Sequence, residues 1–426
     1  MRRWNLSHYA ISSCVSAALL AGCGGSQPPI GAPGALPQTS ALATRTNRTH
    51  YKVLYSFGAP PDGNNPRAGL IYVGSWLYGT TSGGGSYSCI DTLYQGCGTV
   101  FSVTLGGAER VLYSFGGGSD GSNPLAALID VGGTLYGTTY TGGVKCSYTY
   151  SAARGCGTVF NITPSGAEKV LYRFRGFYDA DGENPIAGLA DVKGTLYGTT
   201  SYGGSCYSSG GCGIVYSITT QGEEKVLYAF SGGHDANFPY AGLIDVKGEL
   251  YGTTASGGRH FWGAVFRITT GGTEKVLHGF DVADGAFPKA GLVELNGKLY
   301  GTTSEGGAYS CSSYRKGCGT VFSIPRRGGT ENVLHSFEGG DGDFPSASLS
   351  ELNRKFYGTT QGGGAYNDGT VFCITPSGKE KVLHSFGYGT DGRAPFAGLI
   401  DVNGTLYGTT SSGGTYNNGT VFALKP

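Results

Sequence analysis

The sequence is poor in charge. Only 14% of its 426 residues are Asp, Glu, Lys or Arg, against about 25% in an average soluble domain. The net charge is +1, so there is no basic excess for nucleic acid or an anionic membrane surface. The sequence has no His-Glu-x-x-His motif and no glycine-rich phosphate loop followed by Lys, and no Gly-x-Ser-x-Gly lies at a strand–helix elbow. These absences exclude the common zinc-peptidase, nucleotide-binding and serine-hydrolase patterns.

Glycine and tyrosine are abundant instead. The chain has 79 Gly and 29 Tyr, and glycine far exceeds its usual share of about 7%. This composition is typical of many short strands joined by tight turns, and it argues against long surface helices.

The first 22 residues have the organisation of a secretory signal peptide. A basic start, "MRR", precedes a short apolar stretch that ends in "LAGC" at Cys23. This ending resembles the lipobox of bacterial lipoproteins, which implies cleavage before Cys23 and diacylation of that residue. Gly24 stands where an Asp would resemble an inner-membrane retention signal, so we expect the outer membrane or cell surface. The alternative is an ordinary signal peptide that happens to contain a Cys.

Residues 23–50 are rich in Pro, Gly, Ser and Thr and show no hydrophobic periodicity. Such a segment cannot bury enough apolar surface to order itself. We therefore predict a lipidated, flexible tether that holds residues 51–426 away from the lipid. The lipid anchor makes the membrane an expected partner, and nucleic acid is not one.

One motif is repeated throughout the remainder. "GTLYGTT" occurs at 133–139, 194–200 and 404–410, and looser copies begin at 75, 248, 297 and 354. Each unit of roughly 55 residues, a period typical of propeller blades, holds four short apolar segments, exemplified by "AGLIDV", "TLYGTT", "GTVFSIT" and "EKVLYSF". We name them strands A to D. Short glycine turns join A to B and C to D, which predicts a four-stranded antiparallel meander.

The predicted sheets need cover on both sides. Both faces of strands C and D are largely apolar, so neighbouring sheets must pack against them. The glycine inside strand B, such as Gly137, is expected to let a neighbouring sheet approach closely.

The ends of the chain indicate how the repeats are arranged. Residues 51–57 form a strand D with no A, B or C before it, and residues 419–426 form a strand C with no D after it. Pairing the two completes a seventh sheet and removes two exposed edges. The sequence therefore predicts an all-β fold, a single seven-bladed propeller of four-stranded blades, and a monomer. An open solenoid of seven sheets is the alternative.

The repeats also resemble a known family. Its pattern, G-x-L-Y-G-T-T-x-x-G-G followed by G-T-V-F, occurs here seven times, with departures such as "GIVY" (213–216) and "GAVF" (263–266). This resembles the choice-of-anchor tandem-repeat, GloVer-containing family over about 51–426. The resemblance implies a secreted or anchored repeat protein, and it brings no catalytic residues with it.

The cysteines support export. Eight of the 11 fall in close pairs that flank the loop between strands B and C, and such pairs in an exported protein predict disulfides. Zinc binding is the alternative, although it needs tighter spacing. The pairs are Cys89/Cys97, Cys146/Cys156, Cys206/Cys212 and Cys311/Cys318. Cys373 is left over, and we expect a buried free thiol there.

Every loop from strand D to the next strand A contains an aspartate. A ring of seven carboxylates would suit Ca²⁺, another hard cation or sugar hydroxyls. The alternative is that each Asp caps its own turn, which explains its presence in every unit. No cofactor is predicted otherwise. The residues are Asp62, Asp120, Asp181, Asp235, Asp284, Asp341 and Asp391.

The fourth unit breaks the symmetry. Its B–C loop lacks cysteines and contains Arg259, His260, Phe261 and Trp262. A cation, an imidazole and two aromatics can stack on a sugar ring or hold an acidic group. The alternative is that the aromatics fill the space that disulfide loops occupy elsewhere.

Three functions follow from these features. The first is a surface-anchored binding or scaffolding propeller that recognises a glycan or an envelope protein through its loops. The second is an extracytoplasmic polysaccharide hydrolase or lyase, which requires an asymmetric pair of carboxylates. The third is a purely structural envelope protein.

Overall fold

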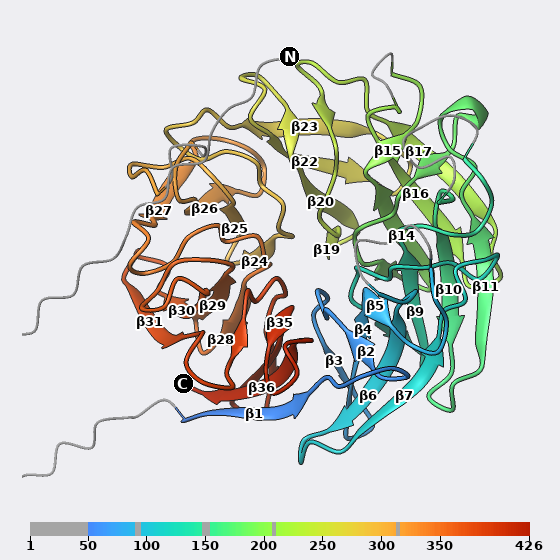
Figure 1. The fold of residues 1–426 in the computed structure, drawn as a ribbon. Coiled ribbons are helices and arrows are strands. Elements are labelled where there is room, and N and C mark those ends of the chain that lie inside the picture. The colour runs from blue at the N-terminus through green and yellow to red at the C-terminus, as the bar shows by residue number, and fades with distance from the viewer. Residues whose placement is uncertain (1–49, 90–94, 147–153, 207–209, 312–315) are drawn as a thin grey trace, which may run out of the picture. The chain divides into compact units, whose positions relative to one another are not determined.

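The computed structural model describes residues 50–89, 95–146, 154–206, 210–311 and 316–426. These residues form seven four-stranded antiparallel sheets arranged around a common centre (Figure 1). The expected signal peptide (1–22), Cys23 and nearly all of the expected tether (23–50) lie outside the described residues. No helix in the described part of the chain is long and apolar enough to cross a membrane.

The first four blades follow one another along the chain. Blade 1 consists of β3 (Ile71–Val73), β4 (Trp76–Thr81), β6 (Thr99–Thr104) and β7 (Glu109–Ser114). Blade 2 consists of β8 (Ile129–Val131), β9 (Thr134–Thr139), β10 (Thr158–Ile162) and β11 (Glu168–Arg173). Blade 3 consists of β13 (Ala190–Val192), β14 (Thr195–Thr200), β16 (Ile214–Thr219) and β17 (Glu224–Ala229). Blade 4 consists of β19 (Ile244–Val246), β20 (Glu249–Thr254), β22 (Ala264–Thr269) and β23 (Glu274–Gly279).

The remaining three blades include the one that joins the two ends of the chain. Blade 5 consists of β24 (Val293–Leu295), β25 (Lys298–Thr303), β26 (Thr320–Pro325) and β27 (Asn332–Ser336). Blade 6 consists of β28 (Ser350–Leu352), β29 (Lys355–Thr360), β30 (Thr370–Ile374) and β31 (Glu380–Ser385). Blade 7 consists of β33 (Ile400–Val402), β34 (Thr405–Thr410), β36 (Thr420–Lys425) and β1 (His50–Ser56).

Short strand pairs and one helical turn complete the secondary structure of the described residues. In four blades the loop entering strand A pairs with the start of the B–C loop, so both loops lie on one face of the ring. We call this the loop face. The pairs are β2 (Gly63–Asn64) with β5 (Gly83–Gly84), β12 (Gly182–Glu183) with β15 (Tyr202–Gly203), β18 (Ala236–Asn237) with β21 (Ser256–Gly257), and β32 (Gly392–Arg393) with β35 (Ser412–Gly413). The 3-10 helix η1 spans Phe177–Asp179.

Closure of the ring occurs within blade 7. Strand β1 pairs antiparallel with β36, from His50 opposite Lys425 to Ser56 opposite Thr420. Figure 1 shows this blue strand lying against the red strands of the opposite chain end. The predicted propeller and its closure are thus confirmed, and the open solenoid is excluded.

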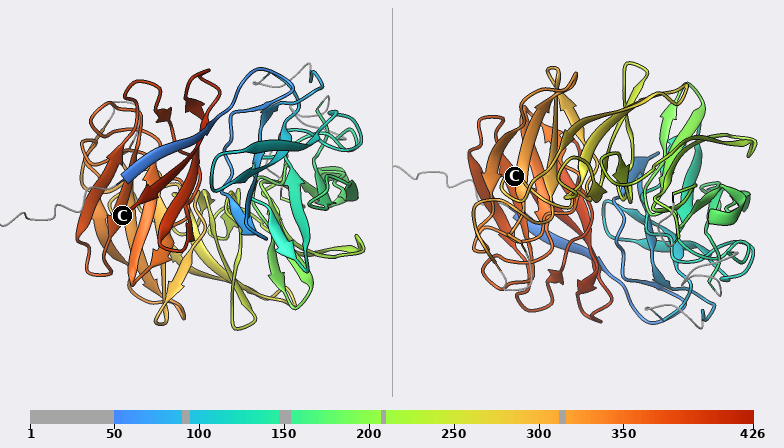
Figure 2. Two further views of the ribbon diagram at one scale, coloured as in Figure 1. Left: turned by 90° about the horizontal axis from the view of Figure 1, so that it is seen from below. Right: turned by 90° about the horizontal axis from the view of Figure 1, so that it is seen from above.

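The threonines of the repeated motif connect consecutive blades near the axis. Strand A is innermost in each sheet, and the side views of Figure 2 show the sheets standing around the axis. In all seven blades the first Thr of "YGTT" donates a hydrogen bond of 2.9–3.3 Å to an alanine carbonyl just before strand A of the next blade. The last of these joins Thr409 to Ala68 and closes the circle. The pairs are Thr80–Ala126, Thr138–Ala187, Thr199–Ala241, Thr253–Ala290, Thr302–Ala347, Thr359–Ala397 and Thr409–Ala68.

Small residues allow the backbones to meet around the axis. The residue after each of these alanines is Gly, Ala or Ser. A Cβ on Gly242 would lie 3.1 Å from the carbonyl oxygen of Gly188 in the preceding blade, and one on Gly398 would lie 2.9 Å from that of Ser348. Larger side chains would push the blades apart at the axis, so this position keeps the ring narrow.

The glycine inside strand B has a different role from the expected one. A Cβ on Gly137 would lie 2.7 Å from the ring of Phe160, its cross-strand partner in the same sheet, and 2.7 Å from Leu128 of the same blade. The expectation that a neighbouring sheet approaches this glycine is therefore wrong. The aromatic ring of the paired strand covers the glycine, so the constraint lies within the blade.

The core is divided among the blade interfaces. Seven clusters of buried residues each combine side chains from two consecutive blades. The Phe that follows each strand D is fully buried, and it packs edge-on against an aromatic ring of strand C in the next blade. Phe57 and Phe101, with ring centroids 5.0 Å apart, continue this pattern across the closure. Each sheet is thus covered on both faces, as its composition predicts.

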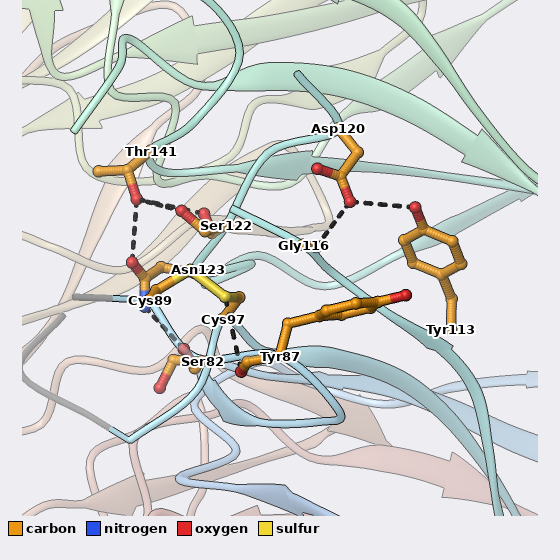
Figure 3. The surroundings of a disulfide bond; sticks show 10 residues. All are labelled: Ser82, Tyr87, Cys89, Cys97, Tyr113, Gly116, Asp120, Ser122, Asn123 and Thr141. Carbon is orange, nitrogen blue, oxygen red and sulfur yellow. Dashed lines mark hydrogen bonds between the residues drawn. A yellow bond between two sulfur atoms is a disulfide. The ribbon is translucent and has the colours of Figure 1, made fainter. Parts of the chain in front are cut away.

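Four disulfides stabilise the B–C loops. They join Cys89–Cys97, Cys146–Cys156, Cys206–Cys212 and Cys311–Cys318, as predicted. Figure 3 shows the first of them beside the loop that leads to blade 2. A Cβ on Gly117 of that loop would lie 2.2 Å from Sγ of Cys89, so the disulfide packs directly on its backbone. Cys373 has a free thiol and is half-buried rather than buried.

The Thr–Ala bonds generate a stability prediction. Thr199→Val keeps the shape of the side chain but removes the donor to the Ala241 carbonyl. We expect the free energy of unfolding to fall by about 1 kcal/mol, measured by denaturant titration. Thr199→Ser keeps the hydroxyl and should lose less. A valine variant as stable as the wild type would contradict this role.

Candidate functional site

The loop aspartates support their own turns. Oδ2 of Asp120 accepts hydrogen bonds from the Tyr113 hydroxyl at 3.0 Å and from the Gly116 amide at 2.7 Å (Figure 3). The Tyr lies on the outermost strand of the blade, so the carboxylate lies near the outer rim. Equivalent contacts recur at the other six aspartates, which therefore do not gather at the axis. Those residues are Asp62, Asp181, Asp235, Asp284, Asp341 and Asp391.

Histidine replaces tyrosine in three of these contacts. Nε2 of His278, His335 and His384 lies 3.0, 2.7 and 2.8 Å from the carboxylate of its loop aspartate. The rings stand where tyrosines stand in the other blades, as the sequence pattern indicates. Each histidine has its own aspartate, and the three do not meet.

A glutamate of the following blade joins each of six aspartates, and the sequence analysis missed it. Glu224 opens strand β17, and burial together with the charge of Asp181 raises the pKa of its carboxyl to about 7. Oε1 of Glu224 is buried and accepts no hydrogen bond from any described residue. The only signal in the sequence is the Glu of "EKVL", which six units share and which Tyr51 replaces in the first. The six are Glu109, Glu168, Glu224, Glu274, Glu331 and Glu380.

Variable side chains surround the loop-face end of the axis. A cavity of about 320 Å³ follows the axis between the small residues of the innermost segments. The residue after the proline of each D–A loop lines it and differs in every blade. Two of them are cations that lie over phenylalanine rings: Arg67 over Phe396 at 4.4 Å, and Lys289 over Phe344 at 4.8 Å. The seven residues are Arg67, Leu125, Ile186, Tyr240, Lys289, Ser346 and Phe396.

The residues of the fourth B–C loop separate into two groups. Trp262 takes the place of the second cysteine of the four disulfide loops, and it packs edge-on against Phe287 at 5.3 Å with Nζ of Lys316 3.9 Å from its ring. Phe261 instead points toward His234 of the preceding D–A loop, with ring centroids 5.5 Å apart. Arg259, His260 and Phe261 are exposed. The space-filling role fits Trp262, and the other three offer an accessible surface.

Exposed aromatic side chains concentrate on the loop face. Ten large hydrophobic side chains of the described residues are exposed, and eight of them lie in B–C or D–A loops. Only Tyr72 and Trp76 lie at the opposite face, beside the A–B hairpin of blade 1. The eight are Tyr87, Val144, Tyr178, Phe261, Tyr309, Tyr366, Tyr388 and Tyr416.

The chain is similar to one family and to several solved propellers. A family model described as the Gloeobacter/Verrucomicrobia repeat matches residues 41–207 and 205–422. No curated protein matches the chain.

Among solved structures, virginiamycin B lyase from Staphylococcus aureus is 12% identical with a TM-score of 0.54, over 89% of this chain and 99% of that chain. The WD40 domain of Neurospora crassa Pan2 is 10% identical with a TM-score of 0.51, over 88% of this chain and 95% of that chain. An oligogalacturonate lyase solved in complex with manganese is 11% identical with a TM-score of 0.51, over 89% of this chain and 96% of that chain. At such identities the likeness shows a shared fold alone.

The buried glutamates generate a pH prediction. The pKa of Glu224 is about 7 in the folded chain and 4.5 for an exposed carboxyl, so the folded state holds its proton more tightly. This contribution to stability is complete below about pH 4.5 and is lost as the pH rises toward 7. Glu224→Gln should therefore raise the melting temperature more at pH 8 than at pH 5. The exposed neighbour provides the control, because Glu223→Gln should change the melting temperature equally at the two pH values. If the Glu224 variant also changed the melting temperature equally at both, Glu224 would not have the raised pKa.

Proposed function

The chain belongs to the Gloeobacter/Verrucomicrobia repeat family, and from this premise we propose that it is an extracytoplasmic binding propeller, anchored by lipid at Cys23, whose loop face recognises a glycan. Four disulfides suggest the extracytoplasmic location. The family gives the repeat architecture, and the proposal for the ligand rests on the surface of this chain.

The observation that carries the proposal is the concentration of exposed aromatic rings on one face. Tyr388 is 75% exposed and Tyr416 63% exposed, while Tyr366 lies 5.9 Å from Tyr388 between ring centroids. Exposed rings stack on the apolar faces of sugars, and their hydroxyls bond to sugar hydroxyls. The cations Arg67 and Lys289 beside the axial cavity add donors for polar or acidic substituents.

The arrangement of carboxylates favours binding over bond cleavage. Glycoside cleavage needs one pair of carboxyl groups at a cleft, whereas here similar Asp–Glu pairs recur at six blade interfaces. A feature repeated at six of the seven interfaces fits a role in the fold better than a single catalytic site. The hydrolase hypothesis is therefore the weaker one.

A glycan array with the purified chain tests the proposal. We expect binding to a defined set of glycans, at least tenfold weaker in the double variant Tyr366→Ala/Tyr388→Ala and also weaker in Phe261→Ala. Trp76→Ala removes an exposed aromatic from the opposite face and should leave binding unchanged. Absence of glycan binding, or equal losses in all three variants, would contradict the proposal and favour a protein partner or a structural role.

The lipid anchor has a separate test. The lipobox predicts that Cys23 carries the diacyl group, so the wild-type chain should partition with membranes. Cys23→Ser should release the folded chain into the soluble fraction, and mass spectrometry of the wild type should find the lipid on the peptide that begins at residue 23. A serine variant that stays on the membrane would rule out this anchor.

A further inference from the structure

Two neighbouring blade interfaces each bring a histidine and two carboxylates together, and we propose that each binds one divalent transition cation, with Zn²⁺ as the best-matched ion. Site 1 lies between blades 4 and 5, and site 2 between blades 5 and 6. Site 1 consists of His278, Asp284 and Glu331, and site 2 of His335, Asp341 and Glu380.

The distances at both sites are close to those of a coordinated ion. In each site one atom from each of the three side chains lies within 4.8 Å of the other two. Nε2 of His278 is 3.0 Å from Oδ2 of Asp284, and Nε2 of His335 is 2.7 Å from Oδ2 of Asp341. Ligands of a tetrahedral Zn²⁺ stand ~3.3 Å apart, given bonds of 2.0–2.2 Å. The His–Asp distances are those of hydrogen bonds and are shorter than this spacing, so ion binding requires each His–Asp pair to open slightly and the three ligand atoms, now within 4.8 Å of one another, to adjust around the ion.

Rigid elements hold the ligands of site 1. His278 lies on β23 and Glu331 directly precedes β27, the outermost strands of consecutive blades, and Asp284 lies in the loop that joins the two blades. The imidazole packs edge-on against Phe280, with ring centroids 4.7 Å apart. An ion here would join two blades at their outer edge, far from the axial Thr–Ala bonds.

Site 2 repeats this arrangement one blade further on. His335 lies on β27 and Glu380 on β31, and His335 packs edge-on against Phe337 at 4.9 Å. A cavity of about 420 Å³, lined in part by Tyr309, His335 and Asp341, opens beside it. Three protein ligands leave a fourth position open, and this cavity gives that position room for water or a small ligand.

Each glutamate offers an oxygen that a cation could use. Oε1 of Glu331 and Oε1 of Glu380 are buried, and neither accepts a hydrogen bond from any described residue. A buried carboxylate oxygen normally has a donor or a cation as partner. A cation at either site would be a partner for this oxygen, the aspartate and the imidazole together. The equivalent oxygens at the four tyrosine interfaces also lack a hydrogen-bond partner among the residues that the structure describes, so the histidine is what distinguishes sites 1 and 2.

In the described part of the chain, the other five blade interfaces each lack one of the three ligand types. Four of them have a tyrosine in place of the histidine, and its hydroxyl donates to the aspartate without offering a nitrogen ligand. At the last one, His384 contacts Asp391, but Tyr51 replaces the glutamate and stacks on the imidazole at 3.8 Å. Among the described residues only sites 1 and 2 have all three ligands at a blade interface.

The donor set decides which ion fits. One imidazole nitrogen and two carboxylate oxygens suit a borderline ion such as Zn²⁺. Ca²⁺ needs six to eight oxygen ligands, which neither site provides. Zn²⁺ is therefore the probe, and Ca²⁺ the contrast.

Metal content of the tag-free chain tests the proposal. After removal of metal with a chelator, equilibration with Zn²⁺ and dialysis, elemental analysis should find two Zn²⁺ per chain. His278→Tyr and His335→Tyr should each leave one Zn²⁺ per chain, and the double variant should bind none. Because tyrosine occupies this position in four other blades, the variants should still fold. His384→Tyr is the matched control and should retain two. Zn²⁺, but not Ca²⁺, should raise the melting temperature of the wild type and leave that of the double variant unchanged.

Two results would overturn the inference. One is a wild-type chain that keeps no Zn²⁺ after dialysis. The other is a double variant, folded by circular dichroism, that keeps as much Zn²⁺ as the wild type.

Discussion

The bond from a threonine hydroxyl to an alanine carbonyl of the next blade is the interaction on which the ring depends. It recurs at all seven interfaces, and Thr409 makes it to Ala68 across the point where the chain ends meet. A buried carbonyl without a donor is costly, so each unit must present its threonine to its neighbour at the same height. This explains why the chain repeats "YGTT" seven times. The first threonine of the motif makes the contact between consecutive blades, whereas the loops can differ in sequence.

Much of the fold could be predicted from the sequence. The repeat predicts the same four strands in each unit, and the single strand D at the start together with the missing strand D at the end predicts how the ring closes. The role of the glycine in strand B was harder to predict. Its repetition indicates that there is no room for a side chain, but it does not indicate whether Phe160 of the same sheet or a residue of a neighbouring sheet occupies that room. The Asp–Glu pairs could not be derived from a single unit. Asp181 and Glu224 stand 43 residues apart and belong to different blades, so the pair becomes visible only when one unit is placed beside the next.

The candidate binding surface shows the same division between shared and variable positions. The disulfides were predictable from paired cysteines, and Trp262 stands where the second cysteine stands in other loops. The side chains around the axial cavity, from Arg67 to Phe396, could have been found as the one position after each proline that changes in every unit. Which ligand they select depends on their joint geometry, and the sequence of one unit contains no information about its neighbours' side chains.

The central claim is that a closed ring, completed by β1, holds the loops on one face. The most direct measurement compares equilibrium unfolding of two truncated chains. A chain that starts at residue 47 keeps β1 and should unfold in the same single cooperative transition as the full chain. A chain that starts at Gly58 lacks β1 and Phe57, exposes the edge of β36, and should lose that transition or aggregate. If the shorter chain unfolded with the same midpoint and cooperativity as the longer one, the closure would not be what holds the structure together.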